Sequence, residues 1–325
     1  SLMKILITGC CGFIGFSLAK KLLLNKKNII IGIDCLDRYY DVSLKKNRLK
    51  SLIKNDNFKF FKFNLKDKKK IDRVFDAQKI NIVFHFAAQA GVRFSFSNPF
   101  KYIDDNFLSF MNILENIKKN RIKKFFFASS SSVYGDTKKI PSKEHDNLNE
   151  KNLYALSKTF NEKISQVYSE KYDLNICGLR FFTVYGEWGR PDMFMMKYIN
   201  ASIKKNFFYL YNYGKHKRDF TYIDDVTFFM EKIINNKRLK KFSIINISSS
   251  RPYSLYKVMN EINLYFKAPK IIKKKRDSAD VLNTHGSNRK LIDISGKYKF
   301  TSLQIGVRNL CRWYKHYYKL NRNRI

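Results

Sequence analysis

The sequence predicts an α/β fold, a doubly wound parallel sheet with a smaller, interleaved α/β lobe. Apolar runs of strand length alternate with amphipathic helical patterns through the first half of the chain, which is typical of a parallel sheet covered on both faces. The alternation breaks after Arg180, where glycines and prolines separate shorter elements. A later apolar run at 242–247 has the length of one more buried strand and indicates that the chain returns to the main sheet.

Each strand of this sheet is expected where a short apolar run ends in polar or turn residues. Between the strands, Phe107, Phe110, Met111 and Leu114 follow one another at spacings of three and four, so they form the apolar face of a helix. The expected strands lie at 3–8, 29–34, 58–63, 81–86, 123–129, 174–180 and 242–247. The predicted domains are a sheet domain at 1–180 with 218–262 returning to it, and a substrate lobe at 181–217 and 263–325.

Length and composition limit the class of protein. A chain of 325 residues with 44% hydrophobic residues can bury a sizeable core, which excludes disorder as its main state. The 64 Lys and Arg residues against 27 Asp and Glu give a formal charge of +37, a value typical of nucleic-acid-binding proteins. The basic residues form no single block, however, and Lys is enriched along the whole chain together with Asn, Ile, Phe and Tyr. We therefore attribute the charge to an AT-rich coding bias and expect no nucleic-acid partner.

Other classes are disfavoured by what the chain lacks. Its apolar runs are far shorter than the ~18–20 residues of a membrane-spanning helix, and its N-terminus goes straight into a strand without signal-peptide features. Its five cysteines form no CxxC pair, so we predict no metal site. We expect a cytoplasmic protein without a membrane partner.

A glycine-rich turn follows the first predicted strand. Gly9, Gly12 and Gly15 lie in TGCCGFIG and are followed directly by a helical segment, so they supply a tight turn, a bare backbone beside a pyrophosphate and close helix–strand contact. The second strand ends in Asp34, about twenty residues on, where a carboxylate can accept hydrogen bonds from both adenosine ribose hydroxyls and repel a 2′-phosphate. This context predicts a Rossmann sheet that binds NAD, with the nearby Arg38 as a surface residue.

A tyrosine and a lysine four residues apart form a candidate catalytic pair. Tyr154 and Lys158 lie on one face of a predicted helix, where an ammonium about 6 Å away, at an effective dielectric of ~20, lowers the pKa of a phenol by about two units. A phenol so shifted can act as a general base. The fifth strand ends in four serines, 129–132, at the carboxyl edge of the sheet, where ligands of such folds bind.

Six motifs in fixed order carry a family resemblance over nearly all of residues 3–262. They are TGCCGFIG, HFAAQAGVR, ASSSSVYG, YALSK, RFFTVYGEWGRPDM and YNYGKHKRDFTYIDD. In this order they resemble the extended short-chain dehydrogenase/reductase family, and within it the UDP-glucuronate 4-epimerases of capsule and lipopolysaccharide biosynthesis. The resemblance implies a homodimer, formed through helices near 100–119 and 152–171.

The resemblance also implies roles for individual residues. Tyr154 would be the general base and acid, Lys158 its electrostatic partner and a ligand of the nicotinamide ribose, and Ser130 a hydrogen-bond partner of the sugar 4′-oxygen. His85 is expected to be a packed residue, and Asn106 fits a helix-start role equally well. The residues implied to bind NAD are Gly9, Gly12, Phe13, Ile14, Gly15, Asp34, Asn64, Leu65, Ala87, Ala88, Asn106, Tyr154 and Lys158, with Asn64 standing where relatives usually have an adenine-contacting Asp.

For the UDP-sugar, the resemblance implies that Arg218 binds the pyrophosphate. Ser131, Ser132 and Thr183 would hold a sugar carboxylate, with Arg190 as a mobile cation nearby and Arg93 a further cation that favours an acidic sugar. Near the C-terminus, Gly286 and Ser287 replace the Ala-Asp of the family. Nucleotide contacts after residue 263, including any made by Arg276, are therefore left open.

The implied reaction is NAD-dependent epimerisation at C4 through a transient 4-keto sugar, converting UDP-glucuronate into UDP-galacturonate. Related 4,6-dehydratases carry an Asp-Glu pair before the Val-Tyr-Gly motif, and UDP-glucuronate decarboxylases carry a Glu there. This chain has Ser131 and Ser132 instead. The alternatives are a 4-epimerase of a neutral UDP-hexose or UDP-N-acetylhexosamine, a UDP-glucuronate decarboxylase, and a catalytically silent relative that binds NAD or nucleic acid.

Overall fold

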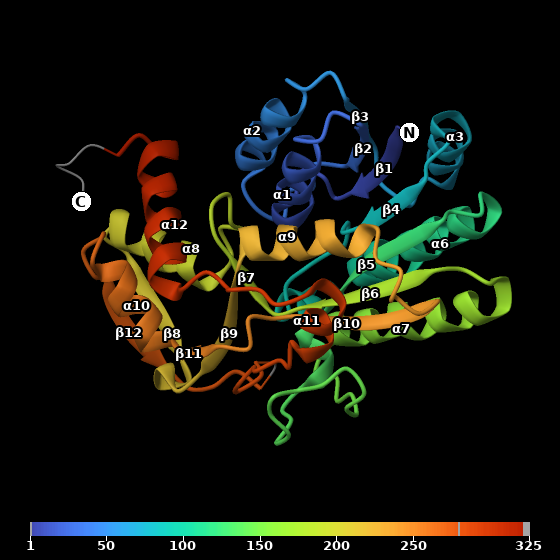
Figure 1. The fold of residues 1–325 in the computed structure, drawn as a ribbon. Coiled ribbons are helices and arrows are strands. Elements are labelled where there is room, and N and C mark those ends of the chain that lie inside the picture. The colour runs from blue at the N-terminus through green and yellow to red at the C-terminus, as the bar shows by residue number, and fades with distance from the viewer. Residues whose placement is uncertain (1, 279, 321–325) are drawn as a thin grey trace.

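The computed structural model describes residues 2–278 and 280–320, and a parallel sheet runs through its centre (Figure 1). Within these residues the sheet has seven strands in the order β10-β6-β5-β4-β1-β2-β3, which is the doubly wound arrangement that the sequence predicts. The strands are β1 (Met3–Thr8), β2 (Asn28–Asp34), β3 (Phe58–Lys62), β4 (Ile82–His85), β5 (Lys124–Ser130), β6 (Ile176–Phe181) and β10 (Phe242–Ile247). All seven predicted strands are confirmed, with boundaries that differ by at most two residues.

Helices cover both faces of the sheet, and each face has its own apolar core. One face carries α1 (Phe13–Leu22), α2 (Val42–Leu52), α9 (Ile223–Ile234) and α11 (Arg289–Ser295); the other carries α3 (Lys68–Gln78), α6 (Ser109–Lys119) and α7 (Leu153–Tyr172). Two short helices, α4 (Phe94–Ser97) and α5 (Pro99–Tyr102), and a π-helical turn, η1 (Ile103–Leu108), lead into α6. Because buried residues of the strands alternate between the two cores, the sheet is apolar on both faces, as its near-continuous hydrophobic runs predict.

The second lobe is built around two small sheets. One holds β7 (Thr183–Tyr185), β9 (Lys217–Tyr222) and β11 (Pro252–Ser254), and the other pairs β8 (Phe207–Tyr211) with β12 (Lys270–Lys274); helices α8 (Phe194–Ile203), α10 (Leu255–Asn263) and α12 (Leu303–Tyr317) pack around them. Of the segment at 218–262, α9 and β10 pack with the main sheet, whereas β9, β11 and α10 pack in the lobe. The chain therefore crosses between the two parts more than once.

A buried ion pair anchors the carboxyl end of β5. Arg180 of β6 donates two hydrogen bonds to Glu162 of α7, at 2.8 and 2.7 Å, and the two side chains are only 4% and 5% exposed. Ser129 donates to the same carboxylate at 2.5 Å, and Arg180 also donates to the hydroxyl of Tyr134 at 2.8 Å. Ser129, the first residue of the serine run, and Tyr134, two residues beyond its end, are thus tied to one buried charge pair.

A second buried arginine joins the two parts of the molecule. Arg48 of α2 is fully buried and donates to the carbonyl of Cys11 in the glycine-rich turn, at 2.9 Å, and to the hydroxyl of Tyr40, at 2.6 Å. It also donates to the carbonyl of Trp188, in the turn that follows β7. One side chain therefore links the turn before α1 to the turn that leads into the second lobe.

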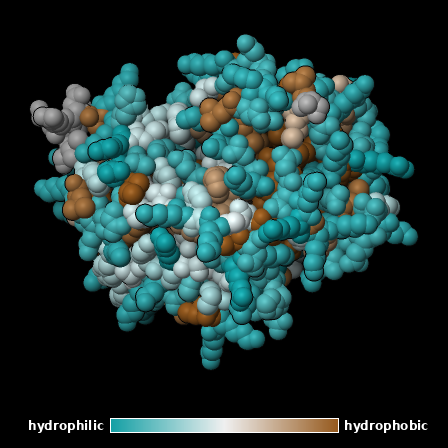
Figure 2. Space-filling view, in the orientation of Figure 1, coloured by the Kyte–Doolittle hydropathy of each residue, from teal (hydrophilic) through white to brown (hydrophobic). Residues whose placement is uncertain are grey.

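The surface is dominated by polar side chains. Figure 2 shows hydrophilic residues over most of one face, with small apolar spots scattered among them. Within the described residues, every helix is too short or too polar to traverse a lipid bilayer.

Candidate active site

A cavity of about 660 Å³ lies at the carboxyl ends of the main strands, between the sheet and the second lobe. Its wall includes the glycine-rich turn, the ends of β2, β4 and β5, the start of α7, and residues of the lobe. Of the predicted site residues, the following line it: Gly9, Gly12, Phe13, Ile14, Gly15, Asp34, Asn64, Leu65, Ala87, Ala88, Arg93, Ser130, Ser131, Ser132, Tyr154, Lys158, Thr183, Arg190 and Arg218. The structure thus brings together in one cavity residues that lie more than 200 positions apart in the chain.

The glycine-rich turn has the geometry of a pyrophosphate cradle. Gly9 has a φ of +70°, and a Cβ on Gly15 would lie 2.2 Å from the carbonyl oxygen of Gly9, so α1 can approach the turn this closely only with glycine at both positions. Helix α1 begins at Gly12 without a side-chain cap, which leaves the positive end of the helix for an anion. These residues fit the diphosphate of a dinucleotide.

The tight contact at Gly15 makes a strong prediction. Gly15→Ala is expected to lower the free energy of unfolding by about 2 kcal/mol, since the new methyl group overlaps backbone that cannot move without opening the turn. NAD binding should weaken at least tenfold, and calorimetry with and without NAD measures both effects. The exposed Lys20→Ala, on the same helix, should change stability by less than about 0.5 kcal/mol. Unaltered NAD affinity in Gly15→Ala would contradict the assignment of this turn.

Asp34 ends β2 at the cavity wall. Its carboxylate accepts hydrogen bonds from the backbone amides of Cys11, at 2.9 Å, and Leu36, at 2.8 Å, which fix both oxygens in place. Burial raises the pKa of this carboxyl group, and the two amides oppose that rise. Lone pairs remain on both oxygens for ribose hydroxyls. Arg38 is exposed, as predicted, and does not line the cavity.

The candidate catalytic pair lies at the first turn of α7, which Asn152 caps by accepting a hydrogen bond from the amide of Ala155. The ammonium of Lys158 is 5.7 Å from the centre of the Tyr154 ring. Burial raises the pKa of Tyr154, while a hydrogen bond with Ser130 and the charge of Arg190 lower it. The separation of Lys158 from the ring matches the distance of about 6 Å expected for a cation acting on the phenol, and the role of Lys158 in lowering the pKa of Tyr154 stays a prediction. Burial lowers the pKa of Lys158 itself to about 8.

Ser130 and the following serines are placed by the end of β5. The Ser130 hydroxyl accepts a hydrogen bond from the amide of Ser132, at 3.1 Å, and so begins the short 3₁₀ turn η2 (Ser131–Tyr134). Ser131 and Ser132 are partly exposed in the cavity, and Thr183 at the start of β7 faces it from the lobe. Four hydroxyl groups therefore line the part of the cavity wall that holds Tyr154.

Asn106 is a correction to the predicted cofactor contacts, because it does not line the cavity. The π-helical turn η1 directs its amide inward, where it accepts from the amide of Gln89 at 2.7 Å and donates to the carbonyl of Gln89 and the hydroxyl of Ser157, each at 3.0 Å. Asn106 thus holds the cavity-lining Gln89 against α7 and leaves no donor for a ligand.

Two buried residues lie behind the cavity wall, one beside Tyr154 and one at the end of β4. Tyr102, which sequence reasoning missed, packs edge-on against Tyr154 with ring centres 6.4 Å apart, and donates to the carbonyl of Ala90 at 2.9 Å. His85 lies within 2.8 Å of the Thr8 hydroxyl, and burial lowers its pKa to about 3. It is a buried packing residue, as predicted. The spacing of Tyr102 in the sequence carries no signal that it meets Tyr154.

The arginines on the lobe side are already engaged. Arg93 pairs with Asp277 at 3.1 Å and Asp280 at 2.5 Å, with its guanidinium 3.7 Å from the centre of the Tyr211 ring. Arg218 donates to two backbone carbonyls of the same segment, those of Val281 and Leu282, at 2.5 and 2.7 Å, and burial lowers its pKa to about 10. Arg93 therefore holds Asp280 at the cavity wall, and Arg218 holds the two residues that follow Asp280.

The departures near the C-terminus also have a packing role. Arg276 pairs with Asp136 and does not line the cavity. A Cβ on Gly286 would lie 2.5 Å from the ring of Phe182, so an alanine at this position would require that ring to shift. Ser287 donates its amide to the carbonyl of Ser142 at 2.8 Å.

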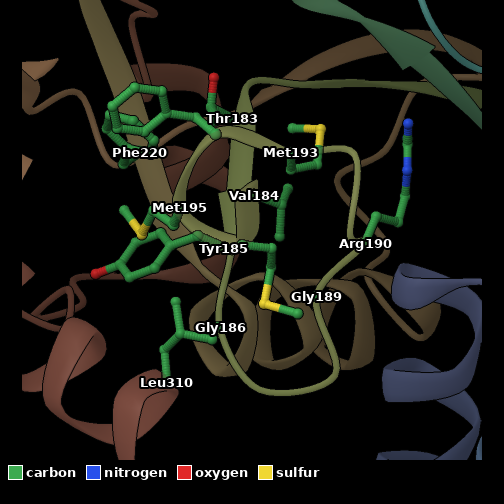
Figure 3. Close-up of a pocket in the computed structure, with 12 residues that line it drawn as sticks. Thr183, Val184, Tyr185, Gly186, Gly189, Arg190, Met193, Met195, Phe220 and Leu310 are labelled. Carbon is green, nitrogen blue, oxygen red and sulfur yellow. The ribbon is translucent and has the colours of Figure 1, made fainter. Parts of the chain in front are cut away.

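Arg190 and Asp192 follow β7 in a loop above a small apolar cavity. Figure 3 shows the guanidinium of Arg190 pointing away from Val184, Tyr185 and Leu310, whose apolar side chains line that cavity. Arg190 binds both oxygens of Asp192, at 3.0 and 2.5 Å. Asp192 carries no signal of its own in the sequence, because only the fold aims it at the site.

Comparison with known proteins places this geometry in a family. Residues 5–248 match the sequence profile of the NAD dependent epimerase/dehydratase family. The chain is 40% identical to Protein CapI of Staphylococcus aureus, covering 98% of this chain and all of that protein. It is 34% identical to a probable UDP-glucuronate 4-epimerase of Rhizobium meliloti (strain 1021), covering 98% of each.

Solved structures agree. The UDP-glucuronic acid 4-epimerase from Bacillus cereus, in complex with UDP-glucuronic acid and NAD, superposes with a TM-score of 0.91 at 29% identity, over 97% of this chain and all of that one. The glycine-rich turn with Asp34, the Tyr154 and Lys158 pair and the match over residues 5–248 lead to one conclusion. The chain belongs to the NAD-dependent epimerase/dehydratase family.

Proposed function

We propose that this protein is an NAD-dependent UDP-glucuronate 4-epimerase that interconverts UDP-glucuronate and UDP-galacturonate in the cytoplasm. The observation that carries the proposal is the convergence of Tyr154, Lys158 and the serine run with Arg190 on one cavity. Relatives and a solved structure named for this activity extend over at least 97% of the chain and support it.

Tyr154, Ser130 and Lys158 each have a separate role in the proposed reaction at C4 of the sugar. Tyr154 takes the proton of the sugar 4′-hydroxyl, with Ser130 holding the same oxygen by a hydrogen bond. The glycine-rich turn and Asp34 would hold NAD⁺, which when bound would supply a hydride acceptor and donor at C4′. Lys158 adds a positive charge below the phenol and a donor toward the nicotinamide ribose. Between the two hydride transfers the 4-keto sugar turns over while the nucleotide stays held.

The serine run favours epimerisation over neighbouring reactions. Dehydration and decarboxylation in related enzymes use acidic side chains where this chain places Ser131 and Ser132, and both serines line the cavity. Hydroxyl groups at this position can hold a sugar carboxylate by hydrogen bonds without supplying an acid or base. A 4-keto glucuronate loses CO₂ when its carboxylate bond stands perpendicular to the carbonyl plane, so these contacts protect the intermediate by holding the carboxylate out of that alignment.

The test is a panel of UDP-sugars followed by NMR of the products. We expect UDP-glucuronate and UDP-galacturonate to interconvert, with NAD retained and no net reduction. A UDP-pentose as main product would mean that the protein is a decarboxylase, and turnover of UDP-glucose or UDP-N-acetylglucosamine alone would mean that it is an epimerase of neutral sugars. No turnover with any member of the panel would contradict the proposal.

We also propose that the protein is a homodimer formed through α5, η1, α6 and α7. Phe100 is 83% exposed on this face and Val167 57%, and both belong to a row of large apolar side chains that water would otherwise cover. The other members of this row are Ile103, Leu108 and Leu156. Packing of two such faces gives an isologous contact with two helices from each subunit.

A charge on this face is expected to separate the subunits. Leu156→Glu should change the mass in light scattering from about twice 38.7 kDa to a single 38.7 kDa, because the carboxylate would be buried at the interface. Leu264→Glu, at a more exposed leucine in the other lobe, should leave the mass unchanged. A wild-type monomer at micromolar concentration would rule out the homodimer.

A further inference from the structure

The loop after β7 contains an ion pair that faces the reaction site. Arg190 binds Asp192 through Nε to Oδ1 at 3.0 Å and Nη2 to Oδ2 at 2.5 Å, and both side chains line the main cavity with 24% and 21% of their surface exposed. Two parallel hydrogen bonds to one carboxylate form the strongest arrangement open to a guanidinium. Arg190 therefore already holds a carboxylate before any substrate carboxylate arrives.

Asp192 is held from the cofactor side as well. The hydroxyl of Tyr39, in the segment after β2, lies 3.4 Å from Oδ2 of Asp192, and its ring packs on Phe94 with centres 5.0 Å apart. The carboxylate is thus kept in place by residues from both sides of the cavity. Burial raises the pKa of Asp192, but the charge of Arg190 outweighs this and lowers it, so the group stays ionised.

The position of the pair relative to Tyr154 gives it a role. Arg190, Asp192 and Tyr154 line the same cavity, and while burial raises the pKa of the Tyr154 phenol, the charge of Arg190 lowers it. A sugar whose C4 faces Tyr154 lies in the cavity that Arg190 also lines, so its carboxylate can pair with Arg190. The other arginines of the cavity are bound on the lobe side, Arg93 to Asp280 and Arg218 to the carbonyls of Val281 and Leu282.

We propose that Asp192 is a positioning residue for substrate selection, a carboxylate that occupies Arg190 and gives it up to the carboxylate of the sugar. This inference rests on the proposed function. When the sugar carboxylate replaces Asp192 on Arg190, one ion pair is exchanged for another, so the net gain in binding free energy is small. The acid sugar is therefore held weakly enough to be released. That matters because the keto sugar has to leave its first contacts in order to present its other face.

Removal of the competing charge tests this. In Asp192→Asn, Arg190 has no anionic partner and should hold the sugar carboxylate more tightly. We expect KM for UDP-glucuronate to fall about fivefold to tenfold and kcat to fall by a similar factor, since turning the sugar now requires breaking a stronger ion pair. The KM of any neutral UDP-hexose that the enzyme binds, measured as an inhibition constant if it is not turned over, should change less than twofold.

Three further variants separate this role from a structural one. Asp192→Glu restores the charge and should bring both constants back toward wild type, and Asp192→Ser removes the charge with a different side chain in case the amide disturbs folding. Asp76→Asn changes the same charge in an exposed ion pair with Lys119, far from the site, and should alter neither constant. Thermal unfolding of each variant reports whether the loop remains folded.

The outcomes are distinct. Two results would overturn the positioning role while leaving the epimerase proposal intact. One is a change in Asp192→Asn that is equally large for acidic and neutral UDP-sugars, and the other is a wild-type KM and kcat in that variant. A wild-type protein that does not turn over UDP-glucuronate would overturn both, and the wild-type assay is run first for this reason. A lower KM and kcat confined to the acid sugar, rescued by Asp192→Glu, is the result expected from carboxylate exchange.

Discussion

Tyr154→Phe is expected to lower the rate of epimerisation by roughly 10³-fold. The substitution removes one oxygen atom at the start of α7, and with it the group placed to take and return the proton of the sugar 4′-hydroxyl. The ring remains to pack edge-on against Tyr102, so the cavity should keep its shape. NMR of the interconverting UDP-sugars measures the rate, and equilibrium dialysis should give an NAD affinity within about threefold of wild type.

The matched control lies on the same helix. Tyr168→Phe removes a phenol hydroxyl that donates to Glu115 at 2.5 Å, away from the cavity, and should leave turnover within twofold of wild type. If Tyr154→Phe retained full activity, another group would have to carry the proton, and the proposed mechanism would be wrong. If it lost NAD as well as activity, the effect would be one of binding and would not identify a base.

The second large effect concerns stability. Glu162→Gln should lower the free energy of unfolding by about 3–5 kcal/mol, because it leaves the charge of Arg180 buried without an anion. In the wild-type protein, burial alone would lower the pKa of Arg180, but hydrogen bonds with Glu162 outweigh burial and raise it. Without Glu162 the guanidinium still keeps its proton, because the intrinsic pKa of arginine is very high, so the charge stays buried. Urea unfolding followed by circular dichroism measures the change.

Two comparisons isolate the buried charge. Glu231→Gln removes the partner of Lys21 in an exposed ion pair with a 3.8 Å separation, and should cost less than about 0.5 kcal/mol. The double variant Glu162→Gln with Arg180→Met removes both charges and should recover part of the lost stability. A Glu162→Gln protein as stable as wild type would mean that water reaches Arg180 in solution.

The fold could be predicted from the sequence because its signals are local. Strands such as β1 and β10 are predominantly apolar runs of strand length, and the order of turn, helix and second strand around Gly9 to Asp34 defines the dinucleotide half. The assignment of β11 and α10 to the lobe could not be predicted, since it depends on contacts with β9, α8 and α12 that are distant in the chain.

Part of the candidate site could also be predicted from local motifs, and part of it could not. Gly15, Tyr154 and Ser130 belong to short motifs, and they line one cavity because parallel strands end at one edge of the sheet. Asn106 was misplaced because a π-helical turn rotates its amide inward, and no spacing rule anticipates such a turn. Burial raises the pKa of Tyr154 and the charge of Arg190 lowers it. The balance depends on how deeply the two side chains are buried, and this cannot be read from the sequence.

Arg48 has a consequence for how this protein can change over evolution or by engineering. It joins the glycine-rich turn to the turn after β7 through the main-chain carbonyls of Cys11 and Trp188. Because main-chain oxygens are the same in every residue, this link places no demand on which side chains stand at those two positions. Residues in the loop that carries Arg190 and Asp192 can therefore be substituted to suit a different sugar, while the hydrogen bonds of Arg48 keep the loop attached to the glycine-rich turn.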